Sequence, residues 1–319
     1  MSERIAEFDL VARIRARAGA RGDVVLGIGD DAALLLPPAG MQLAAAMDTL
    51  NAGVHFPLET APADIGWKAL AVNLSDLAAM GALPAWCTLS LSLPDADAMF
   101  VDGFLDGFLA LAQQHEVMLV GGDTTRGPLS VCVTAHGFVE PGTALRRDGA
   151  RVGDDIWASG TLGDAAAALA QWKSGVDHDA FLRRRLDRPT PRVALGRALR
   201  GIATSCIDVS DGLLADLGHV CEASCVGAQV DVDALPASEA LRISFDAERC
   251  RLLRATGGDD YELCFTAPAD ARDGVPHAAA AAGVRLSRIG RVIEGPGVTA
   301  RMAGGGAWSA SAPGWRHFA

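Results

Sequence analysis

A segment near the middle of the chain, Glu140 to Asp155, is rich in glycine, proline, arginine and aspartate. It separates two stretches that each mix strand patterns with helix patterns, and its composition is typical of a connection between domains. We therefore expect two domains, residues 1–148 and 149–319, which suits a chain of 319 residues. Because strands and helices mix without one strict alternation, we expect an α/β fold of the mixed α+β kind.

The expected helices and strands follow from hydrophobic periodicity. Helices are expected over residues 5–18, 62–81, 97–115, 163–173, 193–200 and 211–225. Strands are expected over residues 24–28, 34–36, 43–47, 88–93, 117–120, 129–139 and 156–159. The remaining C-terminal residues read as a further mix of strands and helices, interrupted by Gly and Pro.

Composition excludes several classes of protein. Half of the residues are apolar, so the chain can bury a sizeable core. The formal net charge of −11 argues against nucleic acid or an anionic membrane as the main partner. The N-terminus lacks the apolar core of a signal peptide, no apolar run is long enough to span a membrane, and the seven cysteines show no zinc-binding spacing. We therefore expect a cytoplasmic protein whose cysteines are small, buried, reduced side chains.

Aspartates recur beside glycines and at the ends of apolar segments. They lie in Gly29-Asp30-Asp31, Asp48-Thr49, Ser75-Asp76, Gly121-Gly122-Asp123-Thr124-Thr125 and Asp208-Val209-Ser210-Asp211-Gly212. Any one of these aspartates could belong to a turn or a helix cap. As a set, converging carboxylates would repel one another unless cations bound them. Oxygen ligands without histidine or cysteine indicate Mg²⁺, which commonly also binds substrate phosphates. The set therefore predicts several magnesium ions and a phosphorylated substrate.

Residues 121–127, GGDTTRG, are the segment that we expect to form the nucleotide loop, because paired glycines let backbone N–H groups approach phosphates. A P-loop is excluded, since neither Lys68 nor Lys173 follows a glycine. Residues 27–32 fit the G-x-G-x-x-A pattern of dinucleotide-binding folds. We reject that interpretation because two acids in the turn would face a pyrophosphate, and Pro37-Pro38 prevents a following helix.

The ordered set of motifs resembles bacterial thiamine-monophosphate kinase, a family of the aminoimidazole-ribonucleotide-synthetase-like superfamily. The resemblance runs from about residue 8 to residue 318. It is carried by GIGDDAALL (27–35), MDTLNAGVHF (47–56), WKALAVNLSDLAAMGALPAW (67–86), GGDTTRGPLS (121–130), SGTLGDA (159–165), DVSDGLLADLGH (208–219), GGDDYELCF (257–265) and GWRHF (314–318).

The resemblance implies ATP-dependent phosphorylation of thiamine monophosphate to thiamine diphosphate, the last step in making that cofactor. It implies an N-terminal domain that binds ATP and Mg²⁺ and whose sheet pairs across a homodimer, and a C-terminal domain that completes the active site. The implied magnesium ligands are Asp31, Asp48, Asp76, Asp123, Asp208 and Asp211. The implied ATP contacts are Gly122, Asp123, Arg147 and Ser210, and the implied substrate contacts are His55, Asp259 and Trp315. Of these, Asp31, Asp123 and Asp208 are the expected catalytic residues.

Two positions depart from the family pattern. Ala46-Met47 stands where family members commonly carry hydroxyl side chains, so a metal contact there would need backbone carbonyls. Asp259 stands where the family favours glutamate, and its carboxylate reaches less far by one methylene group.

The expected chemistry needs no general base, because a phosphate monoester has its second pKa at about 6 and its attacking oxygen is already ionised at neutral pH. We therefore expect direct in-line transfer without a phosphoenzyme. Two alternatives stay open: another ATP-dependent enzyme of the same fold, such as an aminoimidazole-ribonucleotide-synthetase-like ligase, and a non-catalytic sensor of thiamine phosphate or nucleotide. GWRHF and MDTLNAGVHF favour the kinase over the ligase, and the complete aspartate set argues against the sensor.

Overall fold

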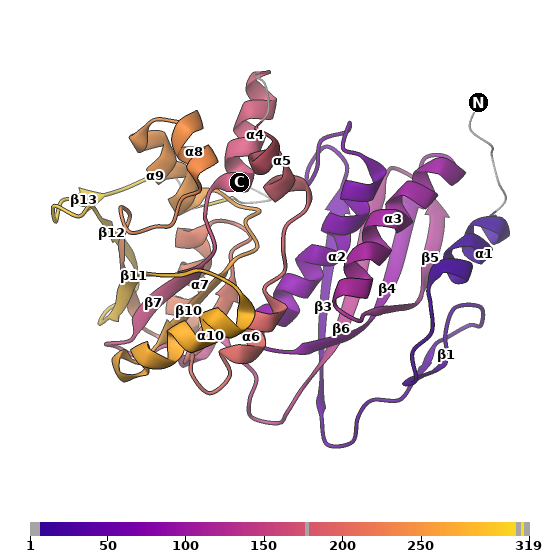
Figure 1. The fold of residues 1–319 in the computed structure, drawn as a ribbon, viewed down its shortest axis with the longest axis horizontal. Coiled ribbons are helices and arrows are strands. Elements are labelled where there is room, and N and C mark those ends of the chain that lie inside the picture. The colour runs from indigo at the N-terminus through magenta and orange to yellow at the C-terminus, as the bar shows by residue number, and fades with distance from the viewer. Residues whose placement is uncertain (1–6, 176–178, 311–313, 316–319) are drawn as a thin grey trace. The chain divides into compact units, whose positions relative to one another are not determined.

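A computed structural model of the chain describes residues 7–175, 179–310 and 314–315. The chain divides into two compact units. Unit 1 comprises Met1–Leu77 and Ala82–Gly142, and unit 2 comprises Ala78–Gly81 and Thr143–Ala319. Both units combine helices with β-sheets (Figure 1), which confirms the expected mixed α/β class.

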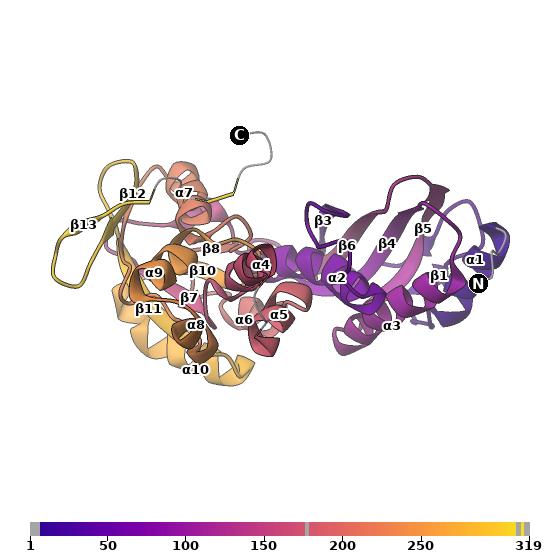
Figure 2. The same cartoon turned by 90° about the horizontal axis from the view of Figure 1, so that it is seen from above.

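Unit 1 is built on a four-stranded sheet in the order β3-β6-β4-β5. The β3–β6 and β4–β6 pairs are antiparallel, and β4–β5 is parallel. Helices α2 and α3 lie together against one side of this sheet (Figures 1 and 2). The elements are α1 (Glu7–Arg17), β1 (Val24–Leu26), β2 (Leu34–Leu35), β3 (Gln42–Asn51), α2 (Pro62–Ala79), β4 (Leu83–Leu93), α3 (Ala98–Gln114), β5 (Met118–Arg126) and β6 (Ser130–Val139).

Helices α2 and α3 approach each other closely because each has a glycine at the crossing. A Cβ atom on Gly66 would lie 2.0 Å from the carbonyl oxygen of Phe104, and one on Gly107 would lie 1.7 Å from that of Ala63. Larger residues would push the helices apart. Because the helices lie close to each other, both can pack on the sheet, where their apolar side chains are buried.

Unit 2 contains a seven-stranded sheet in the order β13-β12-β9-β11-β7-β10-β8. All neighbours in this sheet are antiparallel except β9 and β12. The elements are η1 (Arg147–Gly149), β7 (Asp155–Ser159), α4 (Asp164–Ser174), α5 (Ala180–Asp187), α6 (Val193–Ala198), β8 (Ser205–Asp208), α7 (Leu213–Ser224), β9 (Gly227–Asp231), α8 (Glu239–Ser244), α9 (Ala247–Thr256), β10 (Leu263–Ala267), η2 (Ala269–Asp273), α10 (Gly274–Ala282), β11 (Leu286–Ile293), β12 (Gly297–Arg301) and β13 (Ala307–Trp308).

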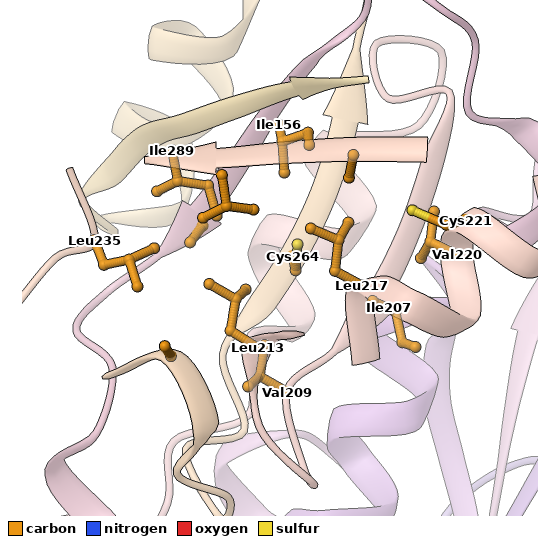
Figure 3. Close-up of a cluster of buried hydrophobic side chains, with 14 of the residues drawn as sticks. Ile156, Ile207, Val209, Leu213, Leu217, Val220, Cys221, Leu235, Cys264 and Ile289 are labelled. Atoms are coloured by element: carbon orange, nitrogen blue, oxygen red, sulfur yellow. The ribbon is translucent and has the colours of Figure 1, made fainter. Parts of the chain in front are cut away.

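The core of unit 2 forms where α7 packs on the sheet. Figure 3 shows Leu213 and Leu217 of α7 among side chains from the strands, including Ile156 and Ile207. Val209, which follows β8, is fully buried in the same cluster. The segment between β8 and α7 is therefore anchored at both ends by apolar burial, and this segment carries several of the expected site residues.

The expected helices and strands are confirmed in type, but several strands differ in extent. Strand β3 continues to Asn51 instead of ending at Met47. Strand β4 begins at Leu83, five residues before the expected start, and β5 continues to Arg126 instead of ending at Val120. The element that follows the G-x-G-x-x-A pattern of residues 27–32 is strand β2 and not a helix. This agrees with our rejection of the dinucleotide-binding interpretation. Five of the cysteines are buried, whereas Cys225 is exposed and Cys132 is partly so, which corrects the expectation for these two. Within the described ranges, no helix combines the length and apolar character needed to cross a membrane.

Candidate active site

The expected nucleotide loop at 121–127 is wrong in its secondary structure, because residues through Arg126 extend strand β5. Their backbone pairs in parallel with β4, and Asp123 lies opposite Ser90. At Gly122, φ is +152°, and a Cβ atom there would lie 1.8 Å from the carbonyl oxygen of Leu89. Gly122 thus permits a close approach between two strands, whereas a Cβ atom on Gly121 would make only ordinary contact. Gly122 and Asp123 remain exposed to solvent.

Asp48 and Asp123 lie on the two edge strands of the unit 1 sheet, within the strands and not at their ends. An edge strand accommodates aspartate because a side chain there can remain hydrated. Asp48 is in register with Val133, Leu89 and Gly122 across the sheet. Three strand spacings therefore separate Asp48 from the Gly122 position, or about 14 Å. A single ion cannot bind Asp48 and Asp123 of one chain together.

Asp48 is instead associated with helix α2. Its backbone N–H donates a hydrogen bond of 3.0 Å to the side-chain oxygen of Asn73, which is fully buried. Asp76 follows Asn73 by three residues, so both project from the same face of α2. The half-buried Asp48 and Asp76 are therefore the two carboxylates of unit 1 that the fold directs toward one region.

His55 lies in a turn after β3 that is fixed by polar contacts. Its Nδ1 accepts a 2.9 Å hydrogen bond from the backbone N–H of Asn51, which leaves Nε2 to carry the proton of the neutral ring. The Nζ of Lys68 donates a 3.0 Å hydrogen bond to the carbonyl oxygen of His55. Lys68 is 2% exposed. Lys68 is not among the site residues expected from the sequence, since no local pattern in α2 indicates that it supports the His55 turn.

Asp31 lies in an exposed turn between β1 and β2. Its backbone N–H donates a 2.9 Å hydrogen bond to a side-chain oxygen of Asp30, a contact typical of aspartate in turns. The Asp31 carboxylate is accordingly accessible to a cation from solvent.

In unit 2, residues 208–212 form what we call the aspartate loop. Asp208 ends β8, opposite Leu263 of β10, and is 4% exposed. The backbone N–H groups of Ser210, Asp211 and Gly212 each lie 3.1 Å from one oxygen, Oδ2 of Asp216. Burial, and then the charges of Asp208 and Asp211, raise the pKa of Asp216 to about 7, although bonds from backbone N–H groups partly oppose this rise. Sequence reasoning missed Asp216, which reads as an ordinary acid in the first turns of a helix.

The aspartate loop also binds the segment that contains Asp259. The N–H of Asp259 donates to the carbonyl oxygen of Ser210, and the N–H of Tyr261 to that of Val209, both at 2.8 Å. Asp259 and Tyr261 have φ values of 66° and 50°, and the Tyr261 hydroxyl donates to a carboxylate oxygen of Asp259 at 3.1 Å. The structure thus brings Ser210 and Asp259 together.

A buried ionic cluster lies directly after this segment. Glu262 is fully buried and accepts hydrogen bonds from Ser159 Oγ at 2.5 Å, Arg185 Nη2 at 2.9 Å and Arg192 Nε at 2.6 Å. Charge-assisted bonds of this kind hold a buried carboxylate rigidly. The cluster therefore fixes the start of β10, next to Asp259.

Trp315 joins the aspartate loop from the C-terminal side. Its backbone N–H donates to the carbonyl oxygen of Asp211 at 2.9 Å, and its side chain is 55% exposed. The indole borders a pocket of about 650 Å³ lined by α7, β12 and β13. Trp308, Asp211 and Glu222 also line this pocket, so aromatic rings and carboxylates share its wall.

Arg147 begins η1, which follows β6 in the chain and contacts β8 and α7. Its carbonyl oxygen accepts a 2.8 Å hydrogen bond from Ser224 Oγ at the end of α7, and its side chain is exposed. The neighbouring Arg146 forms an ion pair with Asp148 at 2.5 Å. Of the two adjacent arginines, Arg147 is therefore the one whose guanidinium is available to an anionic ligand.

The carboxylates suit magnesium in kind, although they do not form a ready-made cage. Within residues 7–175, 179–310 and 314–315, no three Asp, Glu, His or Cys side chains cluster closely enough to hold a metal together. In the same ranges, no lysine or arginine forms an ion pair with Asp31, Asp123 or Asp211. Because Mg²⁺ is usually held by one or two carboxylates and substrate phosphates, such separate carboxylates fit it.

Comparison with known families and proteins identifies the family of the chain. Residues 29–139 match the family model for the N-terminal domain of AIR synthase related proteins, and residues 151–303 match the model for the C-terminal domain. The chain is 49% identical over 299 residues to the thiamine-monophosphate kinase of Salmonella typhimurium. This alignment covers 91% of this chain and 92% of that protein.

Solved structures give the same result. One is the crystal structure of thiamine-monophosphate kinase from Stenotrophomonas maltophilia, whose sequence is 56% identical to this chain. The match covers 97% of this chain and 100% of that chain, with a TM-score of 0.88. The structure of AaThiL complexed with AMPPCP and TMP is 32% identical, covers 100% of both chains and has a TM-score of 0.78. On this similarity of sequence and fold, the chain belongs to the thiamine-monophosphate kinase family of AIR synthase related proteins.

Proposed function

We propose that the protein transfers the γ-phosphoryl group of ATP to thiamine monophosphate and so forms thiamine diphosphate. The relatives of this name, and the related structure with AMPPCP and TMP, support this function. The structural observation that carries it is the aspartate loop, where the N–H groups of Asp259 and Trp315 bond to the carbonyl oxygens of Ser210 and Asp211. Residues expected to contact nucleotide, metal and substrate therefore either lie in the five residues of the aspartate loop or are hydrogen-bonded to them.

In this proposal Gly122, Asp123, Arg147 and Ser210 contact ATP, and the carboxylates bind several Mg²⁺ ions. The proposed ligands are Asp31, Asp48, Asp76, Asp123, Asp208 and Asp211, of which Asp31, Asp123 and Asp208 are the catalytic residues. When bound, magnesium supplies positive charge that reduces the repulsion between phosphate groups.

Thiamine monophosphate would contact His55, Asp259 and Trp315. The neutral His55 ring presents Nε2–H as a donor to a phosphate oxygen, because its Nδ1 is already an acceptor. The exposed Trp315 indole and the nearby carboxylates suit the permanently cationic thiazolium ring. The shorter reach of Asp259 is accompanied by its contact with Tyr261, which restricts where the carboxylate can lie.

The acceptor oxygen of a phosphate monoester is ionised near neutral pH, since the second pKa is about 6. A general base is therefore unnecessary, and the contribution of the chain is to bind and orient two anionic substrates. His55 would orient the acceptor phosphate, and Arg147 would bind the nucleotide phosphates. Transfer would proceed directly and in line between the two substrates.

We also propose a homodimer that pairs through the edge of β3. This strand of ten residues contains no lysine, arginine or proline, which are the residues that usually protect an edge from pairing. It exposes Leu43 at 54% and Met47 at 65%. Light scattering should give the mass of a dimer for the natural protein and of a monomer for Leu43→Lys. The seven free thiols support our placing of the enzyme in the reducing cytoplasm.

The deciding experiment is an assay of the purified protein with ATP, Mg²⁺ and thiamine monophosphate, with chromatographic detection of thiamine diphosphate. We expect turnover by the natural protein and by Asp106→Asn, whose carboxylate lies on α3 and pairs with Arg17. Folded Asp123→Asn should show no measurable turnover. Binding of thiamine monophosphate without product would indicate the sensor, and the absence of both would favour the ligase alternative.

A further inference from the structure

The two sides of the aspartate loop have different partners. On the N–H side, three consecutive backbone groups, those of Ser210, Asp211 and Gly212, converge on Oδ2 of Asp216. A convergent set of backbone N–H groups is a nest for an anion. Here the anion is a carboxylate of the protein itself, supplied by the fourth residue of α7.

On the carbonyl side, the loop binds two distant parts of unit 2. The oxygens of Val209 and Ser210 accept from Tyr261 and Asp259, and the oxygen of Asp211 accepts from Trp315, all within 2.8 to 2.9 Å. A peptide plane cannot rotate without moving both its N–H and its carbonyl group. The Asp216 carboxylate therefore determines where the carbonyl oxygens point, and with them the segments that carry Asp259 and Trp315.

We propose that Asp216 is a positioning residue: by holding three N–H groups of the aspartate loop, it places the nucleotide contact of Ser210 and the substrate contacts of Asp259 and Trp315 together. The inference rests on the proposed function for the roles of those three residues. Asp216 itself is 3% exposed and touches neither substrate in this proposal.

The alternative is that Asp216 only stabilises the start of α7. A residue inside a helix can also cap it, by reaching back to the N–H of the N-cap residue. Asp216 bonds in this way to Gly212, the N-cap of α7, but it also bonds to Ser210 and Asp211, which precede the cap. The two additional bonds, to N–H groups outside the helix, are explained by the geometry they impose on the loop and not by helix capping.

The test compares Asp216→Ala with Leu217→Ala, a buried apolar neighbour on the same helix that makes none of the loop's hydrogen bonds. Both variants should lower the melting temperature. Only Asp216→Ala should raise the KM values for ATP and for thiamine monophosphate together, by about tenfold or more, where tenfold corresponds to ~1.4 kcal/mol of binding free energy. Leu217→Ala should leave both KM values within about twofold of the natural protein.

Asp216→Asn provides the conservative variant. Its amide oxygen can still accept the three hydrogen bonds, although a neutral acceptor binds more weakly than a carboxylate. We expect both KM values to fall most of the way back, to about threefold above those of the natural protein. Should Asp216→Ala fail to fold, Asp216→Asn carries the test, and unchanged KM values in it would overturn the proposal.

Hydrogen exchange gives a readout that does not depend on kinase activity. The N–H groups of Ser210, Asp211 and Gly212 should exchange slowly in the natural protein and at least tenfold faster in Asp216→Ala, with Leu217→Ala as control. Equal increases in exchange and in KM in both variants would reduce Asp216 to a stabilising residue and refute the inference. If the natural protein lacked kinase activity but the exchange rates behaved as expected, the proposed function would fail while the positioning of the loop would stand.

Discussion

Gly122→Ala should disrupt the pairing of β5 with β4 and displace Asp123. The added Cβ atom would lie 1.8 Å from the carbonyl oxygen of Leu89, whereas ordinary contact begins at 3.4 Å. The strands would therefore have to separate locally by about 1.6 Å, far beyond what dispersion contacts tolerate. The φ of +152° adds strain of roughly 1–3 kcal/mol for a residue with a side chain, and overpacking adds about as much.

We expect the free energy of unfolding of unit 1 to fall by about 3 kcal/mol in Gly122→Ala, measured by urea denaturation. Turnover of thiamine monophosphate should fall about 100-fold, because displacement of a site residue by 1 Å has an effect of this size. Gly121→Ala is the matched control. Its Cβ would lie 3.9 Å from a methyl group of Thr88, so the change should be nearly neutral. Equal behaviour of the two variants would refute the assignment of Gly122 to a close strand contact.

Three further outcomes are expected. Trp315→Ala should weaken thiamine monophosphate binding about tenfold and leave ATP affinity unchanged, because stacking on a cationic ring contributes roughly 1–2 kcal/mol; equal losses for both ligands in titrations would indicate a packing role. Glu262→Gln should lower the free energy of unfolding of unit 2 by about 3 kcal/mol by leaving buried arginines without their carboxylate, and exposed Glu222→Gln should not. Burial lowers the pKa values of His115 and His136 below 6.5. The unfolded chain therefore binds more protons as pH falls through 6.5, so stability should decline there, and the double variant to Gln should show a smaller decline in pH-dependent melts.

The aspartate loop illustrates how far the sequence alone leads. Asp208, Ser210 and Asp211 could be selected from DVSDG, because their residue types and spacing suggest metal and phosphate binding. Their link to Asp259 and Trp315 could not be foreseen. It consists of backbone hydrogen bonds between segments about fifty and one hundred residues apart, and such bonds leave no mark on side-chain pattern.

Strand β5 is the opposite case, because there the local pattern predicts the wrong secondary structure. Two glycines and an aspartate are poor strand formers, so the local pattern predicts a loop at Gly121 to Asp123. The structure shows a strand because β4 supplies a parallel partner for its backbone, and because an edge position keeps Asp123 in solvent.

The sequence by itself determined the elements whose signal is local: the amphipathic helices, the alternating strand β6, the mixed α/β class and the residue types that suit magnesium and phosphate. The tertiary structure alone decided which carboxylates can act together. It separates Asp48 from Asp123 by the width of a sheet, and it places the buried Lys68 beneath His55 and Asp216 against three backbone N–H groups. The physical reason is that periodicity reports only which side of an element is buried, whereas contacts between polar groups depend on strand order and register, which arise when the whole sheet forms.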